Sequence, residues 1–528
     1  MLGPSRDAKP VSVLNQASPS TVSSDAASTP RPSACPGLLR IVAARDGGIC
    51  RIKLPGGELS AAQARAVAQA SARYAAGVIE LTNRANLQLR GVKRGEEAAL
   101  IAALLDAGLG PATGAQRAAD TMMAKNAVNA NVASAVARSA ADATRAPTAT
   151  SADDVRNVMI SPAAGRDPFA LCDTRPLCAE LLSLLQSEAR FAALSPKFAL
   201  LLDGGERLAR VDHPHDVWLA ASNEADGVRF VFGLAGCPPE RENGNTGSPS
   251  QSQHGGPPRA AEKAPTDSTG ALAAILPSQV PALVRALLLT FLDLAAADAT
   301  RMRHLLAAHC ANALLHHAQR YLDFPLTRNA KLAGWHRGTA ADASLRLGAH
   351  AQRVPGTWHA GGQPPLGRLD ADALRGLAAL SQQHGNSTLR LTPWQSVLLP
   401  DVATHAVPAV LAGLTALSLA CDPAQAITRL IACAGSTGCA RGLADTKADA
   451  LRLAARLPAG VDVHLSGCAR SCAAAHCAPH TLLAAAPGLY DLYRRDGQPG
   501  FGQCVARQLT IDQAADMLAR LARSDTDA

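Results

Sequence analysis

The chain of 528 residues is poor in aromatic residues, which make up 3% of it. It has no dense run of basic residues interleaved with aromatics, so it does not favour a nucleic-acid partner. The longest apolar run, over 283–297, is interrupted by Arg285 and Asp293, which predicts a buried or amphipathic helix rather than a membrane span. The polar stretch 1–36 has no apolar core of signal-peptide length. We therefore expect a cytoplasmic protein without nucleic-acid or membrane partners.

Two nucleotide-binding motifs are also missing. No Gly-x-Gly-x-x-Gly lies between a predicted strand and helix, and no Walker loop occurs. A Rossmann site for nicotinamide is therefore not expected, and electrons would come from a separate donor. The formal charge of +8 is modest and suits a small polyanionic substrate.

Four cysteines near the C-terminus form two closely spaced pairs, Cys433-Ala-Gly-Ser-Thr-Gly-Cys439 and Gly467-Cys468-Ala-Arg-Ser-Cys472. A reducing cytosol makes grouped cysteines metal ligands or catalysts rather than disulfides. Structural zinc sites usually space cysteines about two to four residues apart. A five-residue gap combined with a three-residue gap favours a four-thiolate iron–sulfur cluster, with zinc or purely structural cysteines as alternatives. Other cysteines are expected to be small buried hydrophobes, namely Cys50, Cys178, Cys310 and Cys421.

An internal repeat runs through both ends of the chain. Residues 57–63, 77–82 and 86–89 resemble residues 367–373, 387–392 and 396–399, always 310 positions apart. In each copy a capping residue, Ser60 or Asp370, precedes an amphipathic helix, and Ser60 with Gln63 has the form of a capping box. Two short alternating strands follow, and 51–54 adds an earlier strand to the first copy. The unit predicts an antiparallel sheet backed by a helix, and pairing two copies would cover its open edge.

The cysteine spacing and the repeated unit together resemble the sulfite and nitrite reductase family. This resemblance implies an α+β fold with two paired ferredoxin-like half-domains and two α/β lobes, the second of which binds a 4Fe-4S cluster. The expected division is a disordered tail at 1–36, half-domain 1 at 37–93, a connector with a flexible insertion at 94–153, a first lobe at 154–320 with a disordered insertion at 236–270, half-domain 2 at 321–402, and the iron–sulfur lobe at 403–528.

The residues between the last two cysteines, Ala469 and Arg470, resemble those of the precorrin-3B synthases within that family, whereas sulfite reductases typically have Pro-Asn. This resemblance implies an O2-dependent monooxygenase that converts precorrin-3A to precorrin-3B by C-20 hydroxylation with γ-lactone formation, in aerobic cobalamin biosynthesis. It implies an external electron donor, either an NADH-linked reductase or a ferredoxin-like protein. A mononuclear non-haem iron is associated with this branch.

Two other functions stay open from the sequence. One is a sirohaem-dependent sulfite or nitrite reductase on the same scaffold. The other is a non-catalytic iron–sulfur or zinc protein that acts as a binding module.

The segment Thr82-Asn-Arg-Ala-Asn-Leu-Gln-Leu-Arg-Gly91 resembles the family segment whose arginine lines the tetrapyrrole pocket. A guanidinium binds a carboxylate through two parallel hydrogen bonds, so Arg84 is the first candidate for substrate binding. The same resemblance gives six further candidates: Asn83, Asn86, Gln88, Arg156, Lys197 and Arg470.

Some positions depart from the family pattern. Sulfite reductases carry a second lysine two residues after Lys197, where this chain has Ala199. In the second copy, Trp394 stands in the place of Arg84 and is expected to pack. The spacing around the candidate iron ligands His464, His476, Cys477 and His480 differs from the family's His-Pro, so no iron ligand is assigned. The Asp203-Gly-Gly sequence predicts a tight hairpin.

Overall fold

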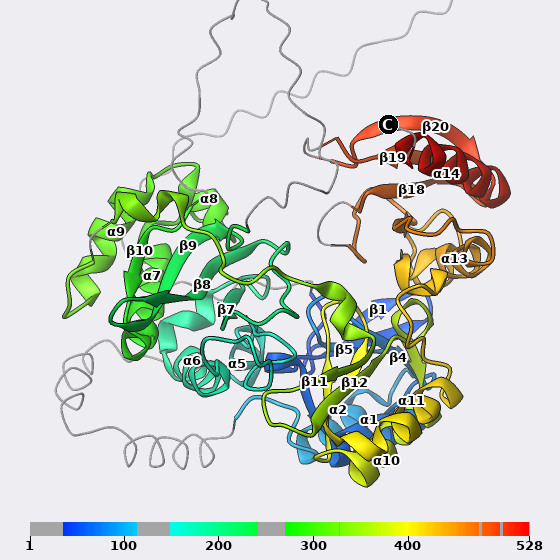
Figure 1. The fold of residues 1–528 in the computed structure, drawn as a ribbon, viewed down its shortest axis with the longest axis horizontal. Helices are drawn as coiled ribbons and strands as arrows, with labels where there is room; N and C mark the ends of the chain where they lie inside the picture. The colour runs from blue at the N-terminus through cyan, green and yellow to red at the C-terminus, as the bar shows by residue number, and fades with distance from the viewer. Residues whose placement is uncertain are drawn as a thin grey trace, which may run out of the picture.

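The computed structural model describes residues 35–112, 148–240, 270–326, 328–474, 478–496 and 500–526. These residues form four five-stranded sheets (Figure 1). The predicted tail at 1–36 and the insertions within 113–153 and 236–270 lie mainly outside the described residues. Of the first insertion, only the end is described, where Thr148 caps helix α5 (Ala149–Asp154).

Two of the sheets are built by the repeated halves, and each completes itself with a strand from the other copy. The first sheet has the order β1 (Val42–Ala44), β2 (Gly47–Ile52), β5 (Leu87–Val92), β4 (Val78–Leu81) and β13 (Arg368–Asp370). The second has the order β11 (Gly348–Ala351), β12 (Thr357–Gly362), β15 (Val397–Ala403), β14 (Thr388–Leu391) and β3 (Glu58–Ser60). All neighbours are antiparallel, and the exchanged strands pair Leu369 with Ile79 and Leu59 with Leu389.

Helices α1 (Ala61–Tyr74) and α10 (Ala371–His384) pack side by side below the two sheets (Figure 1). The predicted capping box is confirmed, because Ser60 Oγ accepts from the Gln63 amide at 3.1 Å and Gln63 Oε1 accepts from the Ser60 amide at 3.0 Å. Asp370 caps α10 through the amide of Ala373 at 2.7 Å.

The 310-residue offset extends further than the sequence comparison detected. It relates β2 to β12, and also helix α2 (Glu97–Asp106) to α11 (Val407–Ala416). One hydrophobic core is shared by both copies, with Val67 and Leu89 from the first and Leu377 and Leu399 from the second.

The first lobe lies between the two halves in the sequence. Its sheet has the order β10 (Ala273–Ile275), β9 (Gly227–Gly236), β8 (His215–Glu224), β7 (Leu200–Asp203) and β6 (Val158–Met159). Strands β6, β7 and β8 are parallel, and β9 and β10 are antiparallel to their neighbours. Its helices are α5, α6 (Arg175–Ser187), α7 (Val280–Leu294), α8 (Met302–Leu306) and α9 (Ala311–Ala318).

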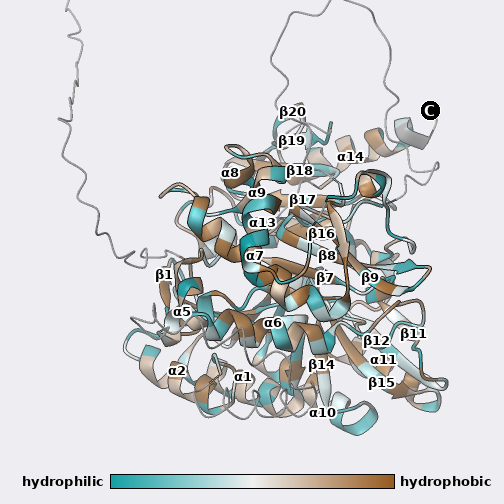
Figure 2. Cartoon of the chain, turned by 90° about the vertical axis from the view of Figure 1, so that its left-hand side faces the viewer, coloured by the Kyte–Doolittle hydropathy of each residue, from teal (hydrophilic) through white to brown (hydrophobic). Residues whose placement is uncertain are grey.

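The helices of this lobe are amphipathic, and their apolar sides pack on the sheet. Figure 2 views the molecule from this side and shows hydrophilic and hydrophobic residues alternating along them. Helix α7 is the most deeply buried of the lobe's helices, which confirms the prediction of a buried or amphipathic helix over the longest apolar run.

The predicted hairpin at 203–205 is wrong. Strand β7 ends at Asp203 but runs parallel to both β6 and β8, so the chain cannot turn back at this point. Asp203 is buried and accepts hydrogen bonds from Arg337 Nε at 2.6 Å and Nη2 at 2.9 Å. The aspartate therefore serves a buried ion pair rather than a turn.

The second lobe follows the second half. Its sheet has the order β16 (Leu430–Ala432), β17 (Val463–Ser466), β18 (His480–Ala486), β19 (Leu489–Arg494) and β20 (Gln503–Leu509), with helices α12 (Gly435–Gly438), α13 (Thr446–Ala454) and α14 (Ile511–Thr526). Three parallel strands followed by two antiparallel ones repeat the arrangement of the first lobe.

Short 3₁₀ turns connect these elements: η1 (Pro55–Gly57), η3 (Ala189–Ala193), η4 (Pro277–Gln279), η5 (Gln319–Tyr321), η6 (Ala330–Gly334), η7 (Ala343–Arg346), η8 (Pro365–Gly367), η9 (Thr404–Ala406) and η10 (Ala426–Arg429). Within the described ranges, no helix has both the length and the apolar character needed to cross a membrane.

Candidate cofactor and substrate site

A cavity of about 1460 Å³ lies where half-domain 1 meets both lobes. Strands β2, β4 and β5 form one wall, the loops that carry the four paired cysteines form another, and Lys197 and Arg301 of the first lobe reach the rim. A ligand cavity usually has a volume of about 300 to 1000 Å³. The space is therefore large enough for a macrocycle beside an inorganic group.

The two cysteine pairs meet because their strands are parallel neighbours. Cys433 directly follows β16, and Cys468 comes two residues after the end of β17. Ala432 pairs with Leu465 in the register of these strands. The carboxyl ends of adjacent parallel strands lie at the same edge of a sheet, where ligands bind in open α/β sheets. All four cysteines line the cavity.

Backbone amides point at the first of these sulfurs. The amides of Gly435 and Gly467 lie 3.4 and 3.2 Å from Cys433 Sγ. Gly435 has a φ of 62°, and a Cβ there would lie 2.7 Å from the Thr446 nitrogen. A Cβ on Gly467 would lie 3.2 Å from the Gly442 Cα and 3.4 Å from the sulfur. The glycines that the sequence places beside the cysteines therefore let the backbone close around the thiols.

The donor set fits an iron–sulfur group. Burial, and then the nearness of Cys468, Cys433 and Cys439, raises the pKa of the Cys472 thiol, and a bound cationic metal core would reverse this by favouring thiolates. In the described part of the chain, no three His, Cys, Asp or Glu side chains surround a single ion position. Four thiols along one cavity wall, with amides directed at sulfur, are the ligands that hold 4Fe-4S clusters.

Arg84 is a partly buried cation on the cavity wall. Its guanidinium makes no hydrogen bond or ion pair with any described residue, although its backbone amide is bonded to Thr82 Oγ1 at 3.4 Å. Burial, with Arg301 and Arg51 nearby, lowers the pKa of Arg84 to about 10. A half-buried and unpaired guanidinium is poised to bind an anionic ligand, in particular a carboxylate.

The three predicted neutral donors also lie on this wall, but each already contacts protein. Asn83 Nδ2 donates to Ala473 O at 3.4 Å, and Asn86 Oδ1 accepts from the Leu54 amide at 2.8 Å. Gln88 accepts from Arg51 Nη2 at 3.1 Å and donates to Glu80 Oε2 at 3.3 Å. Their roles in substrate binding stay predictions.

The three remaining predicted cations differ in position. Lys197 and Arg470 are exposed and line the cavity. Arg156 instead lies behind the wall, where it donates to Leu109 O at 3.1 Å and Lys53 O at 3.2 Å. The structure therefore does not bring Arg156 to the cavity surface with the others.

Several cavity residues were missed by the sequence analysis. Arg51 in β2 and Lys53, the residue directly after its end, both line the cavity. Burial lowers the pKa of Lys53 to about 8, although Asp153 and Asp154 act in the opposite direction. The alternation of two cations along a predicted strand was the available signal. Arg301, which binds Asp216 at 2.9 Å, comes from a remote segment that carries no such signal.

The other cysteines and the histidines are widely distributed. Cys50 and Cys178 are buried as predicted, Cys421 is half-buried, and Cys310 is exposed, so the prediction is wrong for Cys310. His464 is buried within β17, and His480 begins β18 and is half-buried. His476 and Cys477 lie outside the described residues.

Two sequence models of one protein family match this chain. The nitrite/sulfite reductase ferredoxin-like half domain matches residues 43–107 and 350–417, which are the two repeated halves. The nitrite and sulphite reductase 4Fe-4S domain matches residues 151–326. Together they cover more than half of the chain. The chain belongs to the nitrite and sulfite reductase family.

Individual relatives are similar over most of their length. A precorrin-3B synthase from Sinorhizobium sp. is 27% identical over 507 residues, which are 94% of this chain and 90% of that protein. The chloroplastic ferredoxin–nitrite reductase of Zea mays is 27% identical over 446 residues, 80% of this chain and 67% of that protein. The structure of the Mycobacterium tuberculosis NirA protein aligns with a TM-score of 0.65 at 19% identity, covering 90% of this chain and 80% of that one, and this likeness supports the fold.

Membership confirms the predicted fold class, a duplicated nitrite and sulfite reductase architecture of mixed α and β structure. It places the chain in a family of oxidoreductases and supports an iron–sulfur cluster. The segment matched by the 4Fe-4S domain is the first lobe, whereas the four paired cysteines lie in the second. Since both lobes have the same strand order, the second is a further copy of this architecture.

Proposed function

We propose that this chain is a precorrin-3B synthase, a monooxygenase that uses dioxygen and an external reductant to convert precorrin-3A into precorrin-3B. The main support for this proposal is the alanine at position 199. Where a sulfite reductase has a second lysine, Ala199 is buried, and its amide donates to Asp216 Oδ2 at 2.9 Å. The large cavity is lined by cations that suit the carboxylates of a large ring, among them Arg84 and Lys197. The second lysine expected for reducing a small oxyanion is absent.

Three further observations support this proposal. The relative named precorrin-3B synthase is similar over 94% of this chain. Ala469 and Arg470 between the last two cysteines resemble the same branch. The unpaired guanidinium of Arg84 lies on a wall of a cavity of about 1460 Å³, where it would bind a peripheral carboxylate of the substrate.

The reaction balances with a two-electron donor. One atom of dioxygen becomes the C-20 hydroxyl of the product, and the other leaves as water with two protons and two electrons from the donor. An iron–sulfur cluster, when bound, supplies single electrons and does not itself insert oxygen. The chain's own residues would bind and orient the macrocycle: Arg84 and Lys197 at its carboxylates, and Arg470 beside the cysteine loops. The donor would be an NADH-linked reductase or a ferredoxin-like protein, and oxygen activation would use a further centre, for which a mononuclear non-haem iron is the candidate.

The test is a labelled turnover experiment. Anaerobically purified protein is mixed with precorrin-3A, a reductant and ¹⁸O2, and the product is analysed by mass spectrometry. We expect a gain of one oxygen atom, carrying the label, in a product that contains a lactone. Protein that leaves precorrin-3A unchanged but reduces sulfite or nitrite with reduced viologen would refute the proposal.

A sirohaem-dependent sulfite or nitrite reductase is the second candidate. A ferredoxin–nitrite reductase is as similar in identity, 27%, as the precorrin-3B synthase. In this case the exposed thiol of Cys472, which lines the cavity, would face the sirohaem iron. Sharp sirohaem absorption bands in the purified protein would favour this candidate, whereas broad iron–thiolate absorption alone would favour the synthase. Tightly held zinc without either spectrum would indicate a binding module instead.

A further inference from the structure

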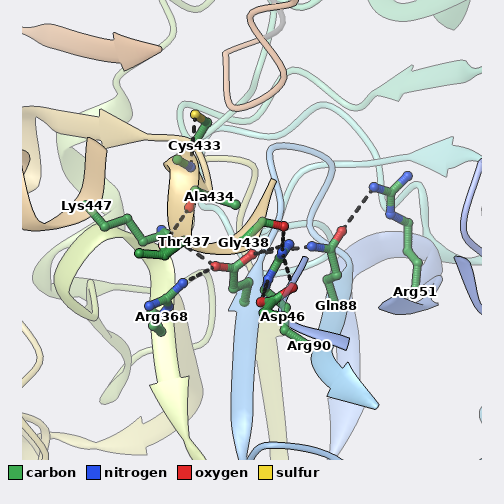
Figure 3. A network of polar contacts seen from close by, with 12 residues as sticks. Asp46, Arg51, Gln88, Arg90, Arg368, Cys433, Ala434, Thr437, Gly438 and Lys447 are labelled. Carbon is green, nitrogen blue, oxygen red and sulfur yellow. Dashed lines mark hydrogen bonds and ion pairs between the residues drawn. The ribbon is translucent and has the colours of Figure 1, made fainter. Parts of the chain in front are cut away.

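A buried polar network joins half-domain 1 to the loop that carries Cys433 and Cys439 (Figure 3). Arg90 in β5 lies at its centre, with 4% of its side chain exposed. Its Nε and Nη2 donate to the two carboxylate oxygens of Asp46, each at 2.8 Å. The same Nη2 donates to the carbonyl of Gly438 at 2.7 Å. Arg90 therefore holds the peptide that directly precedes Cys439.

Lys447 in α13 contacts the carbonyl that precedes Cys433, as Arg90 contacts the carbonyl that precedes Cys439. Its Nζ donates to Leu366 O at 2.9 Å and lies 3.5 Å from Ala432 O, the carbonyl that directly precedes Cys433. Its side chain is 10% exposed. Each cysteine of the first pair thus follows a carbonyl that is held by a buried cation.

Glu80 in β4 connects the two cations. Its carboxylate lies 3.6 Å from Arg90 Nη1 and 3.8 Å from Lys447 Nζ, and it accepts from Arg368 Nη2 at 2.8 Å. Burial alone would raise the pKa of Glu80, but Lys447, Arg90 and Arg368 lower it, so the carboxylate is charged. The network therefore fixes two positive charges beside the cysteines, and the carboxylate of Glu80 balances them.

The loop is shaped to accept the arginine. A Cβ on Gly438 would lie 2.5 Å from Arg90 Nη2, so no residue with a side chain could stand there while Arg90 held this position. The second half-domain, which faces the lobe without paired cysteines, has Pro400 at the position of Arg90 and Arg390 at that of Glu80. Among the described residues, the second half-domain therefore lacks the equivalents of Arg90 and Glu80.

We propose that Arg90 and Lys447 are positioning residues for the cluster: through the carbonyls of Gly438 and Ala432 they hold Cys439 and Cys433 at ligand positions and raise the reduction potential of the bound cluster. Hydrogen bonding and net charge around a cluster set its potential, and a reduced cluster carries one further negative charge that nearby cations stabilise. The proposal rests on the iron–sulfur site and not on the choice of tetrapyrrole substrate.

The test compares four variants of the full chain purified without oxygen. Arg90→Gln and Lys447→Gln remove the charge and the contact, Arg90→Lys keeps the charge but loses the fork that holds both Asp46 and Gly438, and Arg368→Gln removes a partner of Glu80 that does not touch the loop. For each protein, iron and acid-labile sulfide are assayed, iron release to a chelator is timed, and the cluster is titrated against redox dyes.

We expect Arg90→Gln and Lys447→Gln to lower the midpoint potential. Arg90→Gln should also release iron faster, by a factor comparable to the roughly 10- to 100-fold loss of metal affinity that follows removal of an outer-shell partner. Arg90→Lys should restore the potential but not the release rate, and Arg368→Gln should match the wild type in release rate. Equal potentials and release rates in Arg90→Gln, Lys447→Gln and Arg368→Gln would overturn the proposal. If Arg90→Gln does not fold, Lys447→Gln and Arg90→Lys decide the question. A wild-type protein that binds no iron would refute the cluster itself, which is a separate outcome.

Discussion

The two half-domains have the same backbone plan but opposite chemistry on the face that meets their lobes. In the first copy this face lines the large cavity with charged and polar side chains, whereas five of the equivalent positions in the second copy are uncharged. At the 310-residue offset the pairs are Arg51 and Gly361, Lys53 and Gln363, Arg84 and Trp394, Gln88 and Leu398, and Arg90 and Pro400. The fold tolerates both sets, so the residues on the first face are not required by the architecture.

In the second copy the equivalent space is filled. Trp394 packs against a cluster of Ala163, Leu208, Leu345 and Leu398, and the guanidinium carbon of Arg210 lies 5.3 Å from its ring centroid. This confirms that the residue in the place of Arg84 packs. One copy keeps an open, cationic wall, and the other uses the same position for a contact that joins the half-domain to the first lobe.

Each half-domain also has an ion pair between an exchanged strand and its neighbour, and the positive and negative residues of this pair are swapped between the two copies. Glu80 in β4 pairs with Arg368 in β13, and the related positions carry Arg390 in β14 and Glu58 in β3, which also form an ion pair. The interaction is kept while its polarity is reversed. Only the first arrangement places a carboxylate where it can balance Arg90 and Lys447.

The lobes differ in the same way at the ends of their parallel strands. The strand registers place Ser161 where the second lobe has Cys433, and Gly205 where it has Cys468. Ser161 Oγ donates to Leu208 O at 2.6 Å, and the space beyond β7 holds the buried pair of Asp203 and Arg337. In the first lobe, side chains at the ends of the parallel strands thus form hydrogen bonds and ion pairs within the protein. In the second lobe, the thiols at this edge line the cavity.

The largest expected effect is the loss of the cluster in Cys439→Ser. Without this thiolate we expect the protein to lose most of its iron and sulfide, and the second lobe to unfold at a lower temperature because the loop is no longer anchored. Cys310→Ser, at an exposed cysteine of the first lobe, is the matched control and should keep both. Full iron content in Cys439→Ser would show that the ligand assignment is wrong.

Trp394→Ala should test whether the second copy is structural. We expect it to lower the free energy of unfolding by about 2 to 3 kcal/mol, because a large, half-buried side chain leaves a cavity, measured by denaturant titration. Tetrapyrrole affinity should not change. A loss of affinity with unchanged stability would mean that the second copy also binds ligand.

Arg84→Ala should have the opposite pattern. We expect it to weaken binding of a carboxylated tetrapyrrole by about 2 kcal/mol, or roughly 30-fold, because a charge-assisted hydrogen bond is lost. Fluorescence titration would measure this, with iron content and thermal stability close to wild type. Unchanged affinity would remove Arg84 from the binding site.

Lys53 and Gln363 differ in a way that depends on pH. The folded state lowers the pKa of Lys53 from 10.5 to about 8, so burying the charged form costs stability below pH 8, and this cost disappears as the pH rises towards 10.5. Relative to Lys53→Met, the wild type should therefore gain on the order of 1 to 2 kcal/mol of unfolding free energy across this range. Denaturant titrations at several pH values would show this, and Gln363→Met should give a flat difference. A flat difference for Lys53→Met as well would contradict the assignment.

The sequence predicted the elements that depend on local patterns. The cap at Ser60, the alternating strands around residues 78–89 and the buried or amphipathic helix over 283–297 follow from local patterns alone. The convergence of Cys433 and Cys468 followed from the family resemblance, and the parallel pairing of β16 and β17 explains it.

The parts that could not be predicted depend on contacts between distant segments. Nothing around Asp203 signals that Arg337 will bind it, and a Gly-Gly pair after a carboxylate is typical of hairpins as well as of crossovers. Arg90 is likewise indistinguishable from an ordinary surface arginine until Gly438, far along the chain, is brought beside it.

The exchange of β3 and β13 has a consequence for how this protein can be divided. Each half contributes one strand to the other's sheet. A fragment that ended inside the first lobe would therefore leave β4 without β13 and β3 without β14, so both strands would have unpaired edges. The two copies therefore form one structural unit with a shared core, and the first lobe is an insertion between them in the sequence. A substitution that disrupts the core of either copy should therefore destabilise both sheets.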